Sequence, residues 1–298
     1  MNRRDILKLG TAGMAAGLLP AAARAAGPAV QLRWLGGATL EIEAAGLRIL
    51  TDPCLGEGAE AFTMGDPNEM FDLAKGPNIK THARLTPFPG LAHHNYDVVL
   101  LSHAHEDHFD QAAQAWLDRR VPLLAPEHDS AALARKGFAA QALRHGATRR
   151  FEGPQGLVTV TAVPAVHSLN PQIAALLGMG NGYLIEVQTG GQQQSVYWAG
   201  DSFDAAPVAD ALAGRAAPDL FIPHTGAVGG GGALGQISMD CRQAAEFAAR
   251  LRPKAVLPVH HSTYALYREG PEALRIRHAA MAPKWQLLLP EEGARITL

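Results

Sequence analysis

The sequence of 298 residues contains only 2 cysteines, so we expect neither a disulfide-rich small fold nor a zinc site built from thiolates. It also lacks an excess of either charge, because 26 Lys and Arg stand against 28 Asp and Glu. That balance argues against a nucleic-acid-binding protein with a basic surface. After the N-terminal segment no apolar run approaches the roughly 18 residues of a membrane-spanning helix, so we expect no stable membrane anchor there.

Hydrophobic residues and histidine are, by contrast, well represented. Hydrophobic residues make up 47% of the chain, which excludes a disordered protein and suffices for a large core. The sequence holds 13 histidines, so a metal site would use imidazole and carboxylate ligands. We see no repeat and no domain linker, and we therefore expect one domain over residues 26–298.

The first 25 residues have the layout of an export signal. Arg3 and Arg4 precede a short, glycine-diluted apolar stretch at 9–19, and Ala23-Arg24-Ala25 forms an A-x-A cleavage site. The twin arginine followed by Ile-Leu-Lys resembles a Tat signal, and the stretch falls short of the about 20 residues that span a bilayer. We expect cleavage near Ala25 and a periplasmic protein, and the Tat route implies that a metal can be inserted before export.

The rest of the chain alternates strand and helix patterns, which indicates an α/β domain with mixed sheets. Strands are predicted at 32–35, 39–42, 48–51, 98–101, 123–124, 157–163, 183–187, 196–199, 220–222 and 255–259. Helices are predicted at 111–117, 130–136 and 241–251, with Asp110 and Asp240 as N-caps and Gln243 as a capping-box partner. Residues 53–96 have no clear period, and a long irregular segment of this kind is often functional.

The motif His-Ala-His-Glu-Asp-His at 103–108 follows the strand predicted at 98–101. His103 and His105 alternate, so an extended backbone points them the same way, whereas Asp107 and His108 follow a turn and can face a second position. Such density of ligand-type residues predicts a metal site with two ions. His167, Asp201 and His260 each follow another predicted strand, where open sheets place ligand sites.

Together these residues resemble the metallo-β-lactamase superfamily over about residues 31–298, and most of all its branch of ascorbate-6-phosphate lactonase and related metal-dependent hydrolases. The resemblance implies an αββα sandwich with the metals at one edge. The branch likeness rests on Leu35-Gly36, Thr51-Asp52-Pro53, His167-Ser168, Gly182-Tyr183, Pro218-Asp219-Leu220, Met239 with Ala244, and His260 with Thr263.

The resemblance also implies the roles of the metal ligands. His103, His105 and His167 would hold one ion, Asp107, His108 and His260 the other, and Asp201 would bridge both. Nitrogen and oxygen donors with room for solvent indicate catalytic zinc, with manganese or iron as alternatives. A shared hydroxide would attack a small lactone, ester or amide, with Asp107 orienting it. A phosphodiesterase and a non-catalytic metal- or ligand-binding protein are the alternatives. Glu106 is expected to be a solvated loop residue.

Several positions depart from the family pattern. Gly37 stands where many relatives carry His, and His261 stands where relatives often carry Tyr, so either His260 or His261 can be the ligand; the motif register favours His260. His224 replaces a usually apolar residue, and it either lines the pocket or is an ordinary polar strand end. Cys54 and Cys241 can pair only if they lie close together, and two unrelated buried thiols is the interpretation we favour.

Substrate recognition is expected in the segments that flank the metal edge. Residues 53–95 form one, and 173–180 the other, in which 173–177 is either an apolar wall for the substrate or a short buried helix. His82, His93 and His94 either contact an anion or are merely exposed. Gly229–Gly232 either presents backbone N–H groups to a phosphate or is a mobile loop. The oligomeric state is left open.

Overall fold

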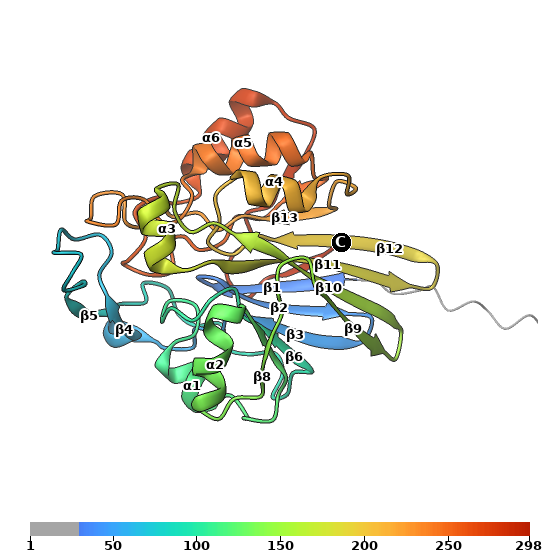
Figure 1. Cartoon of the computed structure of the whole chain (residues 1–298). Coiled ribbons are helices and arrows are strands. Elements are labelled where there is room, and N and C mark those ends of the chain that lie inside the picture. The colour runs from blue at the N-terminus through green and yellow to red at the C-terminus, as the bar shows by residue number, and fades with distance from the viewer. Residues whose placement is uncertain (1–29) are drawn as a thin grey trace, which may run out of the picture.

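The computed structural model describes residues 30–298, so the predicted export signal lies outside the described residues. Within this range two seven-stranded mixed sheets pack against each other, and helices cover the outer face of each sheet (Figure 1). The predicted αββα sandwich of the metallo-β-lactamase type is therefore confirmed. No helix of the described range is long and apolar enough to cross a membrane.

The first sheet has the order β16-β1-β2-β3-β6-β7-β8. Its strands are Arg295–Thr297, Val30–Gly36, Thr39–Ala44, Leu47–Thr51, Val98–Leu100, Leu123–Ala125 and Ala140–Ala142. The pairs from β16 to β3 are antiparallel, and those from β3 to β8 are parallel. Strand β6 lies between β3 and β7 and all its residues are buried, which explains its uninterrupted apolar sequence.

The second sheet repeats this plan with the order β15-β14-β13-β12-β11-β10-β9. Its strands are Gln286–Leu287, Ala255–Val256, Leu220–Ile222, Gln192–Trp198, Gly180–Thr189, Gly156–Ala165 and Thr148–Gly153. The strands from β9 to β12 are antiparallel, and those from β12 to β15 are parallel. The edge strands β8, β9, β15 and β16 were not predicted, because they are short or polar and carry no apolar run.

Helices α1 (Gln111–Trp116) and α2 (Glu127–Arg135) pack on the first sheet, whereas α4 (Ala206–Leu212), α5 (Cys241–Leu251) and α6 (Glu272–Met281) pack on the second (Figure 1). The predicted caps are present, since Asp110 caps α1, and Asp240 and Gln243 form a capping box on α5. Helices α4 and α6 were missed: each buries a single side chain within its bounds, and neither begins with a side-chain cap like that of Asp110 on α1.

The main core lies between the two sheets and includes Ile42 and Ile49 from one sheet and Val160, Ile185 and Trp198 from the other. The segment 53–96, which was predicted as irregular, contains a 3-10 turn (Gly58–Glu60) and an isolated hairpin of β4 (Phe62–Gly65) and β5 (Ile79–His82). Helix α3 (Pro171–Leu177) lies at the same end of the sandwich as this hairpin (Figure 1).

Cys54 and Cys241 are both buried and free, as we favoured from the sequence. The thiol of Cys54 lies 3.6 Å from the carbonyl oxygen of Glu106, and that of Cys241 lies 3.4 Å from the carbonyl oxygen of Gly270. Burial raises the pKa of both thiols, that of Cys241 to about 12. The two cysteines therefore belong to separate parts of the core.

Candidate metal centre

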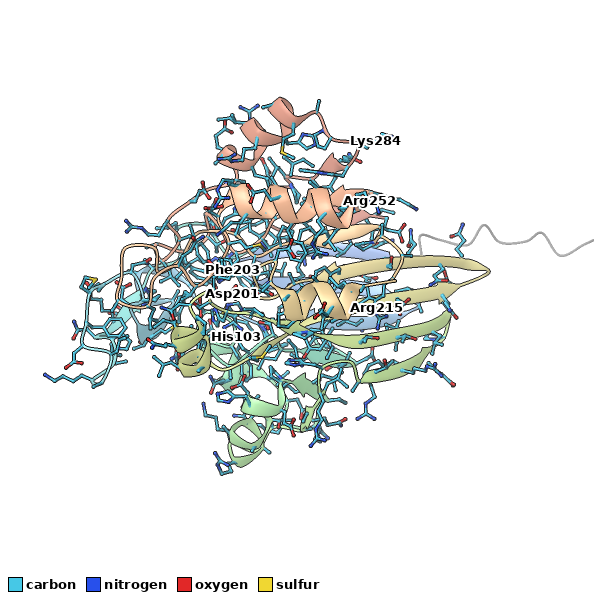
Figure 2. The ribbon with its side chains drawn as sticks, turned by 45° about the horizontal axis from the view of Figure 1, so that its top comes forward. His103, Asp201, Phe203, Arg215, Arg252 and Lys284 are labelled. Atoms are coloured by element: carbon cyan, nitrogen blue, oxygen red, sulfur yellow. The ribbon has the colours of Figure 1, made fainter. Side chains whose placement is uncertain are left out.

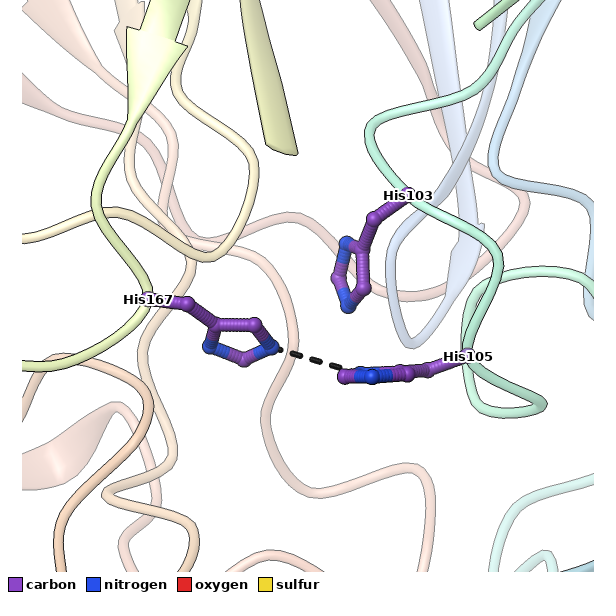
Figure 3. A group of neighbouring side chains, drawn as sticks. All are labelled: His103, His105 and His167. Carbon is purple, nitrogen blue, oxygen red and sulfur yellow. Dashed lines mark hydrogen bonds between the residues drawn. The ribbon is translucent and has the colours of Figure 1, made fainter. Parts of the chain in front are cut away.

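The predicted first group of ligands comes together at one edge of the sandwich (Figures 2 and 3). His103 and His105 lie beyond β6 and His167 beyond β10, and one ring nitrogen of each lies within 4.8 Å of the others. His167 Nε2 is 3.3 Å from His105 Nδ1 (Figure 3). The other nitrogen of His167 donates a hydrogen bond to the carbonyl oxygen of Ile237 at 2.6 Å, so Nε2 is the atom left for a metal.

The predicted second group also comes together. The chain turns after His105, because the amides of His108 and Phe109 donate to its carbonyl oxygen. This turn sends Asp107 and His108 toward His260, whose Nε2 lies 3.4 Å from Asp107 Oδ2. His108 Nε2 lies 3.8 Å from the same oxygen. His260 donates from Nδ1 to the carbonyl oxygen of Thr225 at 3.1 Å, which again leaves Nε2 toward the centre.

Asp201 lies beside both groups. It follows β12, and one of its oxygens forms a ligand group with His103 and His108. Oδ2 is 3.5 Å from His108 Nε2, and Oδ1 is 3.7 Å from His260 Nδ1. Figure 2 labels Asp201 near His103, in agreement with their place in one ligand group. Asp201 is therefore within reach of His103 from the first group and His108 from the second.

Burial and neighbouring charges both shift the pKa values of the side chains in this centre. Burial and, to a smaller extent, the neighbouring His167 lower the pKa of His105 to about 4. Burial opposes ionisation of Asp107, but the facing His108 and His260 outweigh it and lower the pKa of this carboxyl. Burial would likewise keep His108 neutral, yet the carboxylates of Asp201, Asp107 and Asp52 raise its pKa. The buried carboxylates therefore favour a positive charge at this position.

Unpartnered nitrogen atoms give a direct test of whether a metal fits here. The Nε2 atoms of two proposed ligands, His103 and His108, are buried and have no hydrogen-bond partner among the described residues. Leaving such a buried polar atom unpaired costs about 1–3 kcal/mol. Imidazole nitrogens with carboxylate oxygens are a common donor set for zinc, so the residues present fit a divalent ion.

Asp52 is a functional residue to which the sequence assigned no role. It is fully buried at the end of β3, and its Oδ2 lies 2.6 Å from His108 Nδ1. Its Oδ1 accepts a hydrogen bond from the Ser102 amide at 2.7 Å. The carboxylate thereby fixes the ring of His108 with Nε2 toward the centre. A carboxylate directly after a strand, as at the other ligand positions, was the available signal.

His224 does not line the pocket that opens onto the ligands, but its contact with Asp201 makes it more than an ordinary polar strand end. Its side chain is fully buried, and Nδ1 lies 3.0 Å from Asp201 Oδ1. Its ring stacks on that of His108, with 5.6 Å between the ring centroids. Burial lowers the pKa of His224 to about 3, against the raising effect of Asp201, so the ring is neutral and can donate from Nδ1 to the carboxylate.

His260 and His261 face opposite sides. His261 packs against Trp34 with 4.8 Å between ring centroids, and its Nε2 lies 3.2 Å from the carbonyl oxygen of Pro258. The side chain of His260 faces Asp107, and its backbone is in the left-handed region, with φ at 62°. The backbone of Asp52 also has a positive φ, of 32°. Left-handed conformations of non-glycine residues are costly and cluster at functional sites. The geometry therefore keeps His260, and not His261, as the candidate ligand.

Gly37 makes room for aromatic side chains beside the centre. Its φ is +54°, and a Cβ there would lie 2.8 Å from Tyr264 Cε2 and 3.1 Å from the hydroxyl of Tyr267. The ring of Tyr267 lies 4.6 Å from that of His260. A histidine at position 37 would require both tyrosines to move.

A cavity of about 310 Å³ opens onto both ligand groups. It is lined by His105, Asp107, His167 and Asp201 at the centre, and by apolar side chains elsewhere. Both interpretations of residues 173–177 apply. Helix α3 is a short helix that buries only Ile173, and Leu176 and Leu177 line the cavity. Glu106 also lines it and is half-buried, so it is less solvated than expected.

The other candidate substrate contacts lie elsewhere. His82 is buried and stacks on Phe62, and His93 lies 3.0 Å from a Glu43 oxygen; neither lines the cavity, and nor does His94. In the glycine run, the Gly229 amide donates to the Asn68 side chain, and the Gly232 amide donates to the carbonyl oxygen of Gly229. These two amides are already paired within the protein and are not presented to a phosphate.

Comparison with known protein families gives one match over most of the chain. A family model described as a beta-lactamase superfamily domain matches residues 47–261. A UPF0173 metal-dependent hydrolase from Caldivirga maquilingensis is 24% identical over 271 residues, covering 90% of this chain and 97% of that protein. A protein of the same description from Hyperthermus butylicus is 29% identical over 254 residues, covering 82% and 89%.

Solved structures share the fold. An isothiocyanate hydrolase from Delia radicum gut bacteria has a TM-score of 0.72 at 23% identity and covers 90% of this chain and 98% of its own. A possible metal-dependent hydrolase from Veillonella parvula has a TM-score of 0.73 at 21% identity and covers 90% and 99%. At these identities the likeness establishes the architecture.

Proposed function

The chain belongs to the beta-lactamase superfamily, and from that premise we propose that this metal-dependent hydrolase uses two divalent ions to cleave a small lactone, ester or amide. One ion would be held by His103, His105 and His167. The other would be held by Asp107, His108 and His260, with Asp201 between the two. Zinc is the first choice of metal because the donors are nitrogen and carboxylate oxygen, and manganese or iron remain alternatives.

The observation that carries this proposal is that both ligand groups open onto one cavity. Divalent ions supply a Lewis acid and lower the pKa of water toward neutrality. The residues of the chain position the ligands and the substrate. Hydrogen bonds from the outer ring nitrogens fix the orientation of the imidazoles, and the apolar cavity excludes water from the reacting groups. Asp107 Oδ2 faces the cavity edge between His108 and His260, where it can orient a water by accepting its proton in a hydrogen bond.

The experiment is metal analysis joined to a substrate panel. The panel contains a lactone, an aryl ester, an aryl amide and a bis-aryl phosphodiester. It also contains an isothiocyanate, because a protein of this fold is described as hydrolysing one. The lactone comes first because of the resemblance to the ascorbate-6-phosphate lactonase branch. We expect two ions per chain and turnover of at least one carbonyl substrate.

Variants complete this test. Asp107→Ala should abolish turnover while the circular dichroism spectrum is retained, whereas Asp118→Ala, on the exposed surface, should leave turnover unchanged. Fewer than one ion per chain, with no activity after addition of zinc or manganese, would instead support a non-catalytic protein. Turnover of the phosphodiester alone would support the phosphodiesterase alternative.

We also propose that the protein is exported by the Tat route and acts in the periplasm. The twin arginine at Arg3 and Arg4 and the cleavage pattern ending at Ala25 support this proposal. Expression of the full chain in a Gram-negative host, followed by fractionation and N-terminal sequencing, tests it. The substitution of both arginines by lysine should retain the protein in the cytoplasm, and periplasmic recovery of that variant would contradict the Tat route.

A further inference from the structure

We propose that the cavity beside the metal centre selects uncharged substrates with an apolar substituent and rejects those that carry a phosphate or a carboxylate there. This inference rests on the proposed function, because it concerns the substrate of the same site. It is carried by the lining of the cavity, which comes from three separate parts of the chain.

The walls of the cavity are apolar on every side away from the metal ligands. Segment 64–77, around the β4–β5 hairpin, contributes Met64 and Phe71, and α3 contributes Leu176 and Leu177. The segment 228–237 contributes Val228, Leu234 and Ile237, all of which are buried. Leu176 is 58% exposed, and covering such a side chain with an apolar ligand group removes its surface from water.

Positive charge is missing from the described residues that line this cavity. Its charged side chains are the carboxylates of Glu106, Asp107 and Asp201, and no Lys or Arg is among them. Sites for phosphate or carboxylate groups usually supply arginine, lysine or free backbone N–H groups. Away from the metal ligands, an anionic substituent would therefore lose its hydration without gaining an arginine or lysine partner, and it would share the cavity with Glu106.

The lysines of the neighbouring hairpin do not supply the missing positive charge, because each has an acidic partner. Lys80 pairs with Glu69 and lies 3.7 Å from Asp66, and Lys75 lies 3.8 Å from Asp72. Neither lysine lines the cavity. The reacting group of a substrate would thus lie at the metal ligands, and its substituent would lie between α3 and the hairpin segment.

Two matched esters test the selection. The 4-nitrophenyl esters of hexanoic acid and of adipic acid have acyl chains of equal length, and only the second carries a carboxylate at the far end, too distant to attack its own ester readily. We expect kcat/KM for the neutral ester to exceed that for the anionic ester by about tenfold or more. An equal or higher kcat/KM for the anionic ester would overturn the proposal.

A pair of variants ties this preference to the cavity wall. Leu176→Arg places a positive charge on α3 and should reduce the preference for the neutral ester by about tenfold. Leu169→Arg adds the same charge at a site that is 60% exposed and outside the cavity lining, so it should leave the preference unchanged. An equal effect of the two substitutions would mean that overall charge, and not the cavity, sets the preference.

Binding gives a readout that needs no turnover. Pentanohydroxamic acid and succinic monohydroxamic acid share a metal-binding group and differ in the charge of the chain end, and calorimetry on the zinc-loaded protein measures both. We expect the neutral compound to bind about tenfold more tightly. If it does while no carbonyl substrate is hydrolysed, the proposed function fails and the cavity preference stands. Tighter binding of the anionic compound would reject the preference alone.

Discussion

His108 Nδ1 and Asp52 Oδ2 lie 2.6 Å apart, and neither side chain is accessible to solvent. Because a carboxylate accepts hydrogen bonds, Nδ1 carries the proton, and Nε2 is left toward Asp107 and Asp201. The pair thus sets both the tautomer and the direction of a ring at the middle of the metal centre.

Asp52→Asn should weaken metal binding without removing any proposed ligand. The amide cannot hold His108 as a carboxylate does, and loss of such an outer partner typically lowers metal affinity by about 10–100-fold. Competition with a chromogenic chelator measures the affinity. Asp97→Asn is the control, since Asp97 directly precedes β6 and accepts a hydrogen bond from the exposed Arg48 amide, but belongs to none of the ligand groups. Unchanged affinity in Asp52→Asn would show that the pair has no role in metal binding.

His224→Phe separates hydrogen bonding from ring packing. The phenyl ring can keep the stack on His108, but it removes the donor to Asp201 Oδ1. We expect metal affinity to fall by about tenfold, with little change in the melting temperature of the metal-free protein. A large loss of stability without metal would assign His224 to core packing instead.

His260→Ala should lower the metal content by one ion per chain, whereas His261→Ala should retain both ions. The reason is that His260 faces Asp107 and His261 faces Trp34. Inductively coupled plasma mass spectrometry on dialysed protein counts the ions. The two variants control for each other because they are adjacent and both buried. Loss of an ion in His261→Ala alone would reverse the assignment.

The sequence predicted the seven candidate ligands because each follows an apolar strand, and strand ends meet at one edge of a sheet. The partners of those ligands depend on contacts between distant segments. Asp52 is 56 residues from His108, and His224 is 23 residues from Asp201. No local pattern encodes such pairs. The same holds for the cavity, whose walls come from β4, α3 and the segment after β13.

Thiol chemistry should distinguish the native from the unfolded protein. Burial raises the pKa of Cys241 to about 12 and also raises that of Cys54, so both thiols stay protonated and unreactive at pH 8. Without reductant, a thiol-specific chromogenic reagent should therefore find no reactive thiol in the native protein and two per chain in guanidinium chloride. Unfolded protein that releases thiols only after reduction would reveal a disulfide and contradict the structure.

The capping box of α5 should matter for stability and not for the metal centre. Asp240 Oδ1 accepts a hydrogen bond from the Gln243 amide at 2.7 Å, and Gln243 Oε1 accepts one from the Asp240 amide at 2.9 Å. Asp240→Ala removes the first of these and should lower the free energy of unfolding by about 1 kcal/mol. Urea unfolding of the metal-free protein measures this loss.

The control is Glu246→Ala on the same helix, which breaks only an exposed pair with Arg242 and should cost at most about 0.5 kcal/mol. Metal content and turnover should be the same in both variants, because α5 covers the outer face of the second sheet and contributes no side chain to the ligand groups. A loss of metal in Asp240→Ala would instead mean that the start of α5 helps to hold the site. The link would be the segment 237–240, because the carbonyl oxygen of Ile237 accepts the hydrogen bond of His167.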